Sequence, residues 1–286
     1  KEQAEEKRIA EEKRIAEEKR IEEEKRIAEE KRIAEEKRIA EEKRIAEEKR
    51  IAEEKRIAKE KRLAKYLGNR YMVKVPSRNF SIGKTEVTQE LYEEVMGENP
   101  SYYKDINPEM PVNKVNWYDA VIFCNKLSKL AGLTPVYQVN NSKDPDKWGY
   151  DKSNDKNFNK KIEMDENADG FRLPTYEEWV YAAKGGENYK YSGSNNLDEV
   201  GWYYKNSEDH IQKVAQKKAN GYGIYDMSGN VMEWVWNSAS NDYSFRFCYG
   251  GNYYWGEDYC KVDYRYGDYA GSQYNYMGFR ILRPNK

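Results

Sequence analysis

The stretch that decides the fold is residues 221–234, which read GYGIYDMSGNVMEW. Glycine, Asp and Asn interrupt it, and its apolar residues lack the three- and four-residue spacing of a helix. The rest of the last hundred residues has the same character, with short aromatic-rich runs between Gly, Asn and Asp. We therefore expect short strands joined by long irregular segments in this part of the chain.

Upstream of this stretch, three segments carry helix-start signals. Thr88 precedes an apolar pattern that ends at Gly97, and Asn116 precedes a second pattern with Asp119 at its third position. A third helix is expected to begin at Thr175, where the residues 175–178 form a capping box. A few helices together with many short strands indicate an α+β fold.

The first 65 residues have a different composition. The unit Ala-Glu-Glu-Lys-Arg-Ile recurs with a period of six between Ala4 and Leu63, about two thirds of the residues are charged, and none is aromatic. Such a segment cannot build a hydrophobic core. Because six residues turn an α-helix by about 240° net, successive isoleucines fall on three faces and form no coiled-coil seam.

The same repeat favours a solvated single helix. Its residues are good helix formers, and opposite charges lie three or four positions apart, as in Glu5 with Arg8 and Lys7 with Glu11. A helix of this length would span roughly 90 Å and would serve as a stalk. The alternative is a disordered segment with partial helicity.

Composition also excludes several functions. Residues 66–286 hold all the aromatic residues and have a composition usual for one folded domain. The whole chain has a net charge of -1 and no cluster of Lys and Arg outside the repeat, and this charge distribution argues against nucleic acid as a partner. The single histidine, His210, cannot serve a catalytic triad and a histidine-rich metal site together. No apolar run is long enough to span a membrane. Because the sequence begins at Lys1 without methionine, we expect the natural N-terminal signal to be missing.

Four segments in order resemble a known superfamily. They are residues 80–88 (FSIGKTEVT), 171–179 (FRLPTYEEW), 221–234, and Gly250-Gly251 followed by residues 278–280 (GFR). Together they are similar to the formylglycine-generating-enzyme, or sulfatase-modifying-factor, superfamily, over nearly all of residues 71–284. The resemblance implies an α+β, C-type-lectin-like domain at residues 66–286, preceded by the charged helical stalk at residues 1–65.

The enzymes of this superfamily oxidise a cysteine at a copper site made by two cysteines after the Gly-Gly motif. On the alignment of Gly250-Gly251, Cys260 takes the second position and Trp255 takes the first, while Cys248 does not match. Because Trp cannot ligate Cu(I), we expect no catalytic residues and no enzyme activity, with a degenerate copper oxidase as the alternative. The cysteines are expected to be buried thiols, although a Cys248–Cys260 disulfide stays open.

The chain is also similar to the variable proteins of diversity-generating retroelements, which display hypermutated residues on this scaffold. The resemblance implies a variable region at residues 243–280. Residues 243–276 contain ten tyrosines among Asp, Ser, Gly and Asn, a mixture that antibody paratopes use. In those proteins the targeted codons are Asn codons mutated at adenine, which yield Tyr, Asp, Ser, Gly and Cys but never Trp, Met, Lys or Glu. The resemblance therefore implies that Trp255, Glu257, Lys261 and Met277 are fixed scaffold residues.

The expected ligand-binding set follows from this region. Its members are mostly tyrosines and aspartates predicted to be exposed, and the alternative is that half of the tyrosines pack on the scaffold. They are Tyr253, Tyr254, Trp255, Asp258, Tyr259, Asp263, Tyr264, Tyr266, Asp268, Tyr269, Tyr274 and Tyr276.

The resemblance further implies a structural calcium site. Its ligands would be Asp226, Glu233 and the carbonyl groups of Gly229 and Val231, because hard oxygen donors suit Ca²⁺. The alternative is that Glu233 bonds backbone amides while Trp234 fills the core, and that no cofactor is required. Residues 165–176 begin like an EF-hand loop but end in Tyr176 instead of Glu, so we expect a turn there.

These observations predict a non-enzymatic display protein. Its tyrosine-rich surface would bind a protein or another macromolecule, with the stalk holding a monomeric domain away from a bacterial cell surface or outer membrane, as a lipoprotein. A calcium-dependent carbohydrate lectin is a further alternative that rests on fold analogy alone.

Overall fold

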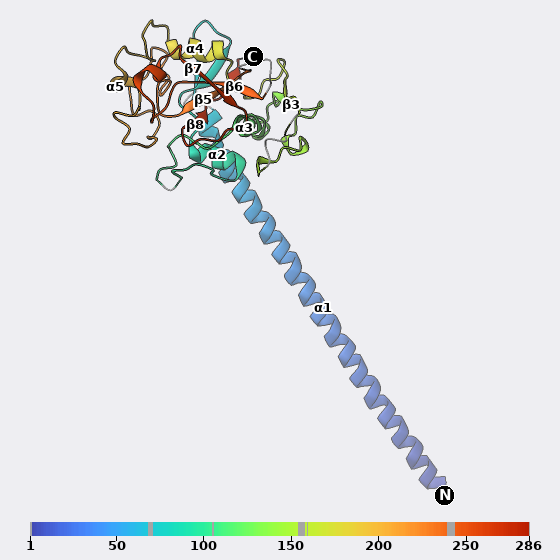
Figure 1. The fold of residues 1–286 in the computed structure, drawn as a ribbon. Coiled ribbons are helices and arrows are strands. Elements are labelled where there is room, and N and C mark those ends of the chain that lie inside the picture. Colours follow the sequence, from blue (N-terminus) through green and yellow to red (C-terminus); the bar gives the residue numbers. More distant parts are fainter. Residues whose placement is uncertain are drawn as a thin grey trace. The chain divides into compact units, whose positions relative to one another are not determined.

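The computed structural model describes residues 2–67, 71–104, 106–153, 158, 160–238 and 244–285. The chain divides into two compact units, residues 1–61 and 62–286 (Figure 1). In the described part of the chain, no helix combines the length and the apolar character that a membrane crossing requires.

Helix α1 (Glu2–Leu67) is the charged repeat. Its arginines bridge glutamates on the preceding and the following turn, as Arg14 does with Glu11 at 2.6 Å and with Glu18 at 2.6 Å. Glu11 therefore pairs with Arg14, and the expected pairing with Lys7 is replaced. The isoleucines from Ile9 to Ile57 are 39–44% exposed, which confirms that they form no buried stripe. The prediction of a long charged helix is thus confirmed.

A four-stranded sheet lies at the centre of the second unit. Its strand order is β7-β6-β5-β8, with β5 and β8 parallel and the other pairs antiparallel. The strands are β5 (Met232–Ser238), β6 (Phe245–Tyr249), β7 (Arg265–Tyr269) and β8 (Met277–Phe279).

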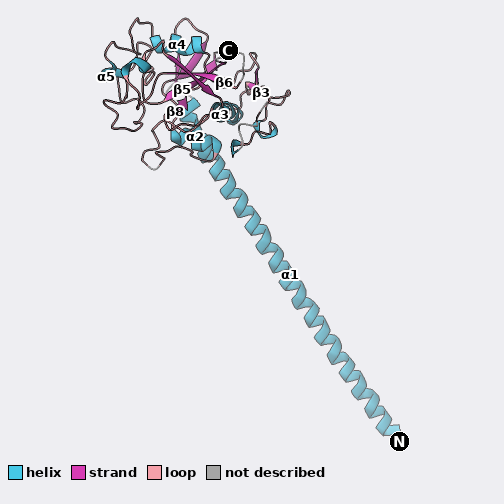
Figure 2. Ribbon diagram, viewed as in Figure 1, coloured by secondary structure: helices cyan, strands magenta, loops and turns pink. Residues whose placement is uncertain are grey.

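Two smaller sheets complete the β structure, and loops join the short elements over most of this unit (Figure 2). One has the order β1-β2-β9 and the other pairs β3 with β4, and both are antiparallel. Their strands are β1 (Met72–Lys74), β2 (Phe80–Gly83), β9 (Leu282–Pro284), β3 (Tyr137–Gln138) and β4 (Glu163–Met164).

The three predicted helices begin at the predicted caps. Thr88 caps one of them, and Asn116 and Thr175 form capping boxes with Asp119 and Glu178. The helices are α2 (Gln89–Met96), α3 (Trp117–Leu130) and α4 (Tyr176–Lys184). Among the described residues, the structure also has single turns that the sequence pattern did not indicate, such as η1 (Pro145–Lys147), α5 (Leu197–Val200) and η3 (Glu257–Cys260).

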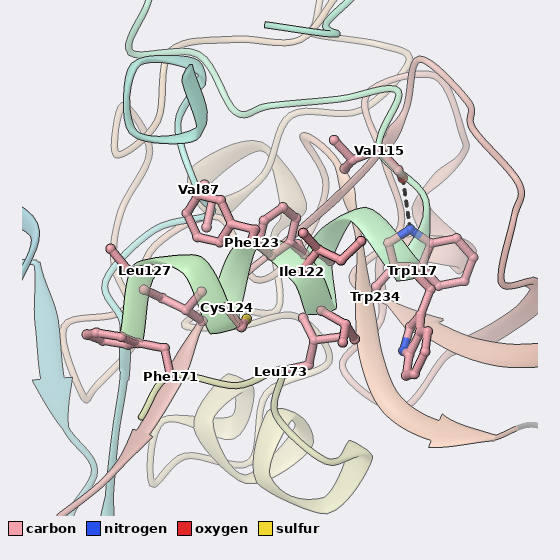
Figure 3. Close-up of a cluster of buried hydrophobic side chains, with 14 of the residues drawn as sticks. Val87, Val115, Trp117, Ile122, Phe123, Cys124, Leu127, Phe171, Leu173 and Trp234 are labelled. Atoms are coloured by element: carbon pink, nitrogen blue, oxygen red, sulfur yellow. Dashed lines mark hydrogen bonds between the residues drawn. The ribbon is translucent and has the colours of Figure 1, made fainter. Parts of the chain in front are cut away.

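The main hydrophobic core packs α3 against β5 (Figure 3). The indole N–H groups of two buried tryptophans donate hydrogen bonds to backbone carbonyl groups. Trp234 Nε1 donates to Val115 O at 3.0 Å and Trp117 Nε1 donates to Val235 O at 3.0 Å. Leu63 is also part of this core, so the division between the two units comes shortly before residue 65.

Candidate ligand-binding face

An aromatic cluster surrounds Trp255. Its ring lies 5.2 Å from Tyr259, 5.2 Å from Tyr266 and 5.6 Å from Tyr276, measured between centroids. Two further rings extend it, because Tyr264 packs edge-on against Tyr259 at 5.2 Å and Tyr274 stacks on Tyr276 at 5.1 Å. We call this the Trp255 cluster, and it comprises Trp255, Tyr259, Tyr264, Tyr266, Tyr274 and Tyr276.

Backbone hydrogen bonds fix the position of Trp255. The Asn252 side chain accepts from the backbone amides of Tyr254 and Trp255, and Trp255 O accepts from Tyr204 N at 3.2 Å. Gly251 adopts a φ of +68°, and a Cβ there would lie 2.7 Å from Cys260 Sγ, so this turn requires glycine. The Gly-Gly motif and Asn252 thus define the turn that positions Trp255.

The cluster is only partly open to solvent. Tyr259 and Tyr274 are exposed, whereas Trp255, Tyr266 and Tyr276 are half-buried. Partial burial, with the neighbouring tyrosines Tyr274 and Tyr266 as a further cause, raises the pKa of Tyr276 to about 12. The phenol of Tyr276 therefore remains neutral near pH 7 and can donate and accept hydrogen bonds at a ligand surface.

Two members of the predicted set are wrong as displayed residues. Tyr253 is 2% exposed because its ring packs among Met110, Ile211 and Val231. Asp268 is 7% exposed because its Oδ1 accepts from the Tyr269 amide and from Ser272 Oγ, each at 2.7 Å.

The remaining predicted residues lie around the cluster or away from it. Tyr254 is 62% exposed beside Tyr253, Asp263 is exposed, and Asp258 pairs with Lys261 at 2.8 Å. Tyr269 is exposed but lies on the other face of β7 from Tyr266, since side chains alternate along a strand. Tyr243, the start of the predicted variable region, lies outside the described residues.

Tyrosines from other segments also border this region. Tyr204 is 50% exposed and lies close to Gly256, next to Trp255. Tyr103 packs edge-on against Tyr253 at 6.4 Å and against Tyr102 at 4.8 Å. No local pattern in the sequence predicts their position, because loops distant in the chain bring them together.

The predicted calcium ligands do not fit a calcium site as a set. Both carboxylate oxygens of Glu233 accept hydrogen bonds, from Arg280 at 2.7–3.1 Å and from Trp179 Nε1 at 2.6 Å. The buried guanidinium thus neutralises the carboxylate that calcium would need. The alternative is thus correct in placing Trp234 in the core but wrong about the partners of Glu233, which are the side chains of Arg280 and Trp179 and not backbone amides.

Of the other calcium candidates, Gly229 and Val231 lie in the turn that leads into β5, and Asp226 retains one unused oxygen. Asp226 Oδ2 accepts from Ala215 N at 2.6 Å, while Oδ1 is buried and bonds no described group. Both carboxylate oxygens of Glu86 are also buried and bond no group in the described part. Burial, with the Asp226 charge as a further cause, raises the pKa of Glu86 well above its usual range.

The cysteines do not form the copper site of the enzymes. Cys124, Cys248 and Cys260 are all buried and free, so the Cys248–Cys260 disulfide left open above is not formed. Cys260 packs with Tyr191 and Tyr203, and burial raises the pKa of its thiol to about 12. A protonated thiol in an apolar cluster is a poor ligand for Cu(I), which binds thiolates.

The family model of the sulfatase-modifying factor enzyme 1-like domain matches residues 52–285. The chain belongs to the FGE-sulfatase family. This FGE-sulfatase chain is 38% identical to the protein named "Chaperone protein LppX" of Paenibacillus barcinonensis over 230 residues, which cover 72% of this chain and 80% of that protein.

Two further comparisons match the FGE-sulfatase domain to a variable protein and to an enzyme. The solved structure "Treponema denticola variable protein 1" matches with a TM-score of 0.65 and 35% identity, over 75% of this chain and 91% of that one. The mouse formylglycine-generating enzyme is 34% identical over 133 residues, which are 36% of this chain and 35% of the enzyme. The predicted superfamily and C-type-lectin-like fold are thereby confirmed.

Proposed function

We propose that this FGE-sulfatase domain is a non-enzymatic display protein that binds a protein or another macromolecule through the Trp255 cluster. The observation that carries this proposal is the cluster itself, in which five tyrosine rings gather around Trp255. Aromatic residues dominate binding hot spots because they bury much area at low entropic cost.

Retroelement diversification would act on the periphery of this cluster. Tyr254, Tyr259 and Tyr274 are exposed members of the predicted region and are accessible from mutated Asn codons, whereas Trp255 is not. We infer that Trp255 is a constant anchor, around which the surrounding tyrosines set the specificity.

The stalk and the location belong to the same proposal. A long charged helix without an apolar seam suits a monomeric spacer, and we propose that it holds the domain away from a bacterial cell surface or outer membrane. The similarity to a protein named LppX and to a treponemal variable protein supports a surface lipoprotein.

We also propose that the fold requires no cofactor, including calcium. Because Arg280 neutralises Glu233, we expect chelation with EDTA to leave the melting temperature of the full chain unchanged within about 1 °C. A decrease of several degrees that added Ca²⁺ reverses would contradict this and would favour the calcium-dependent lectin.

The oxidase alternative is less well supported, because Cys260 is buried as a thiol and Trp255 stands in place of the other cysteine. Isothermal titration with Cu(I) tests it directly, and stoichiometric tight binding would revive it.

The decisive experiment for display is sequencing of the coding segment for residues 243–280, with its genomic neighbourhood, across isolates of the source organism. We expect substitutions at the codons for the exposed tyrosines, beside a near-identical template repeat and a reverse transcriptase gene. An invariant segment without a template would refute diversification.

A further inference from the structure

A cavity lies at the end of β7, apart from the Trp255 cluster. It has a volume of about 520 Å³ and is walled by the rings of Tyr118, Phe158 and Tyr269. Ser244, Ala270 and Ser272 complete its lining. This volume falls within the range of roughly 300–1,000 Å³ that is usual for ligand pockets.

The cavity does not belong to the Trp255 cluster. Along β7, Tyr266 and Asp268 point to one side of the strand, and Arg265 and Tyr269 point to the other. Tyr266 contacts Trp255 at 5.2 Å, whereas Tyr269 packs edge-on against Phe245 at 5.3 Å. The strand therefore separates two aromatic surfaces.

The walls of the cavity are held in place by the scaffold. Phe158 packs edge-on against Tyr118 at 5.1 Å and against Tyr150 at 5.5 Å. On the other side, Ala270 O accepts from Trp117 N at 2.9 Å and Ala270 N donates to Ser244 O at 2.6 Å. Rings fixed in this way lose little freedom when a ligand binds.

The chemistry of the lining selects a neutral aromatic group. The described residues that line the cavity are uncharged and mostly aromatic or small, so this part of the wall favours an apolar group over a charged one. The edge-to-face rings of Tyr118 and Phe158 can pack against a further aromatic ring. Ser244 and Ser272 add polar atoms to the lining, which can contact a polar group at the edge of a bound ring.

We propose that this cavity binds an aromatic side chain of a protein ligand. Tyr269 lines the cavity and also belongs to the predicted variable region, and it is 63% exposed. β7 is also the edge strand of its sheet, a place where an extended segment of a partner can lie. The choice of a protein ligand rests on the proposed display function, but the cavity does not depend on the Trp255 cluster.

The test is titration of the full chain with N-acetyl-tyrosinamide, N-acetyl-tryptophanamide, N-acetyl-leucinamide and N-acetyl-lysinamide, followed by NMR. We expect saturable binding of the two aromatic amides with Kd values of about 1–10 mM, at least about five-fold tighter than the other two. The tripeptide Gly-Tyr-Gly should bind as well as the tyrosine amide, since a protein side chain carries flanking backbone.

Three variants locate the site. Tyr269→Ala should weaken binding at least about five-fold, because it removes one ring from the wall. Tyr102→Ala is the matched control, since Tyr102 is also 63% exposed but does not line the cavity, and it should change nothing. Trp255→Ala should also leave binding unchanged, which separates this site from the proposed display face.

Several outcomes would overturn the proposal. Equal binding of the leucine amide would remove the aromatic selectivity, and failure of Gly-Tyr-Gly to bind would exclude a protein side chain as the occupant. Loss of binding in Trp255→Ala but not in Tyr269→Ala would assign the ligand to the Trp255 cluster. Absence of binding at 20-fold the expected Kd would dismiss the cavity while leaving the display function untouched.

Discussion

At the scale of single residues, two neighbouring tyrosines have opposite roles. Tyr253 is 2% exposed and Tyr254 is 62% exposed. We expect Tyr253→Ala to lower the free energy of unfolding by about 3 kcal/mol, because it leaves a cavity beside Met110 and Val231. Tyr254→Ala should change it by less than about 0.5 kcal/mol. Urea unfolding of both variants checks this, and equal losses would mean that Tyr254 is also part of the core.

A second residue with a testable effect is Asp226. Burial raises its pKa from the ordinary 3.8 to about 6, while the Ala215 amide and Arg280 oppose the shift. Between these values the folded protein holds a proton that the unfolded chain has released. The free energy of unfolding should therefore fall as pH rises from about 4 to 6, by up to about 3 kcal/mol for this group.

The substitution Asp226→Asn should remove this part of the pH dependence and stabilise the protein at pH 7. Asn tolerates the left-handed backbone at this position, where φ is 58°. Asp209→Asn is the matched control, because Asp209 has a φ of 57° but is exposed. Thermal unfolding from pH 4 to 8 decides the matter, and an unchanged slope in Asp226→Asn would show that another group carries the proton.

At the scale of elements, the helices could be predicted because their N-terminal caps are local sequence signals. The caps at Asn116 and Thr175 depend on residues three positions apart, so the sequence alone located both helices. Tyr253 could not be placed in this way, because it packs against Met110 and Ile211, which are distant in the chain. Asp268 accepts hydrogen bonds from Tyr269 and Ser272, in a turn that its alternating sequence pattern did not indicate. The contribution of Tyr204 to the surface beside Trp255 also arises from tertiary contact alone.

The stalk gives a prediction at the same scale. Because α1 has no apolar seam, a change in its length alters no packing register. Insertion of one further Ala-Glu-Glu-Lys-Arg-Ile unit after Ile33 should lengthen the helix by about 9 Å and leave the molecule monomeric. Small-angle scattering and circular dichroism measure both properties. A fall in helix content per residue, or self-association, would instead favour the disordered or the coiled-coil reading of the repeat.

At the scale of the whole molecule, a display scaffold must fold independently of the residues it displays. Tyr254, Tyr259 and Tyr274 are exposed, whereas the core of α3 and β5 is formed by other residues. We therefore expect the triple variant with serine at these three positions to keep its fold, with a melting temperature lowered by no more than about 3 °C.

Near-ultraviolet circular dichroism and thermal unfolding of this triple variant provide the measurement. Tyr253→Ser is the control that should lower the melting temperature further than all three exposed changes together, since a buried ring contributes more to stability than exposed ones. Loss of the folded spectrum in the triple variant would show that the aromatic surface is itself structural. Variation of that surface would then be limited by folding, and the domain could not present a freely diversified set of side chains.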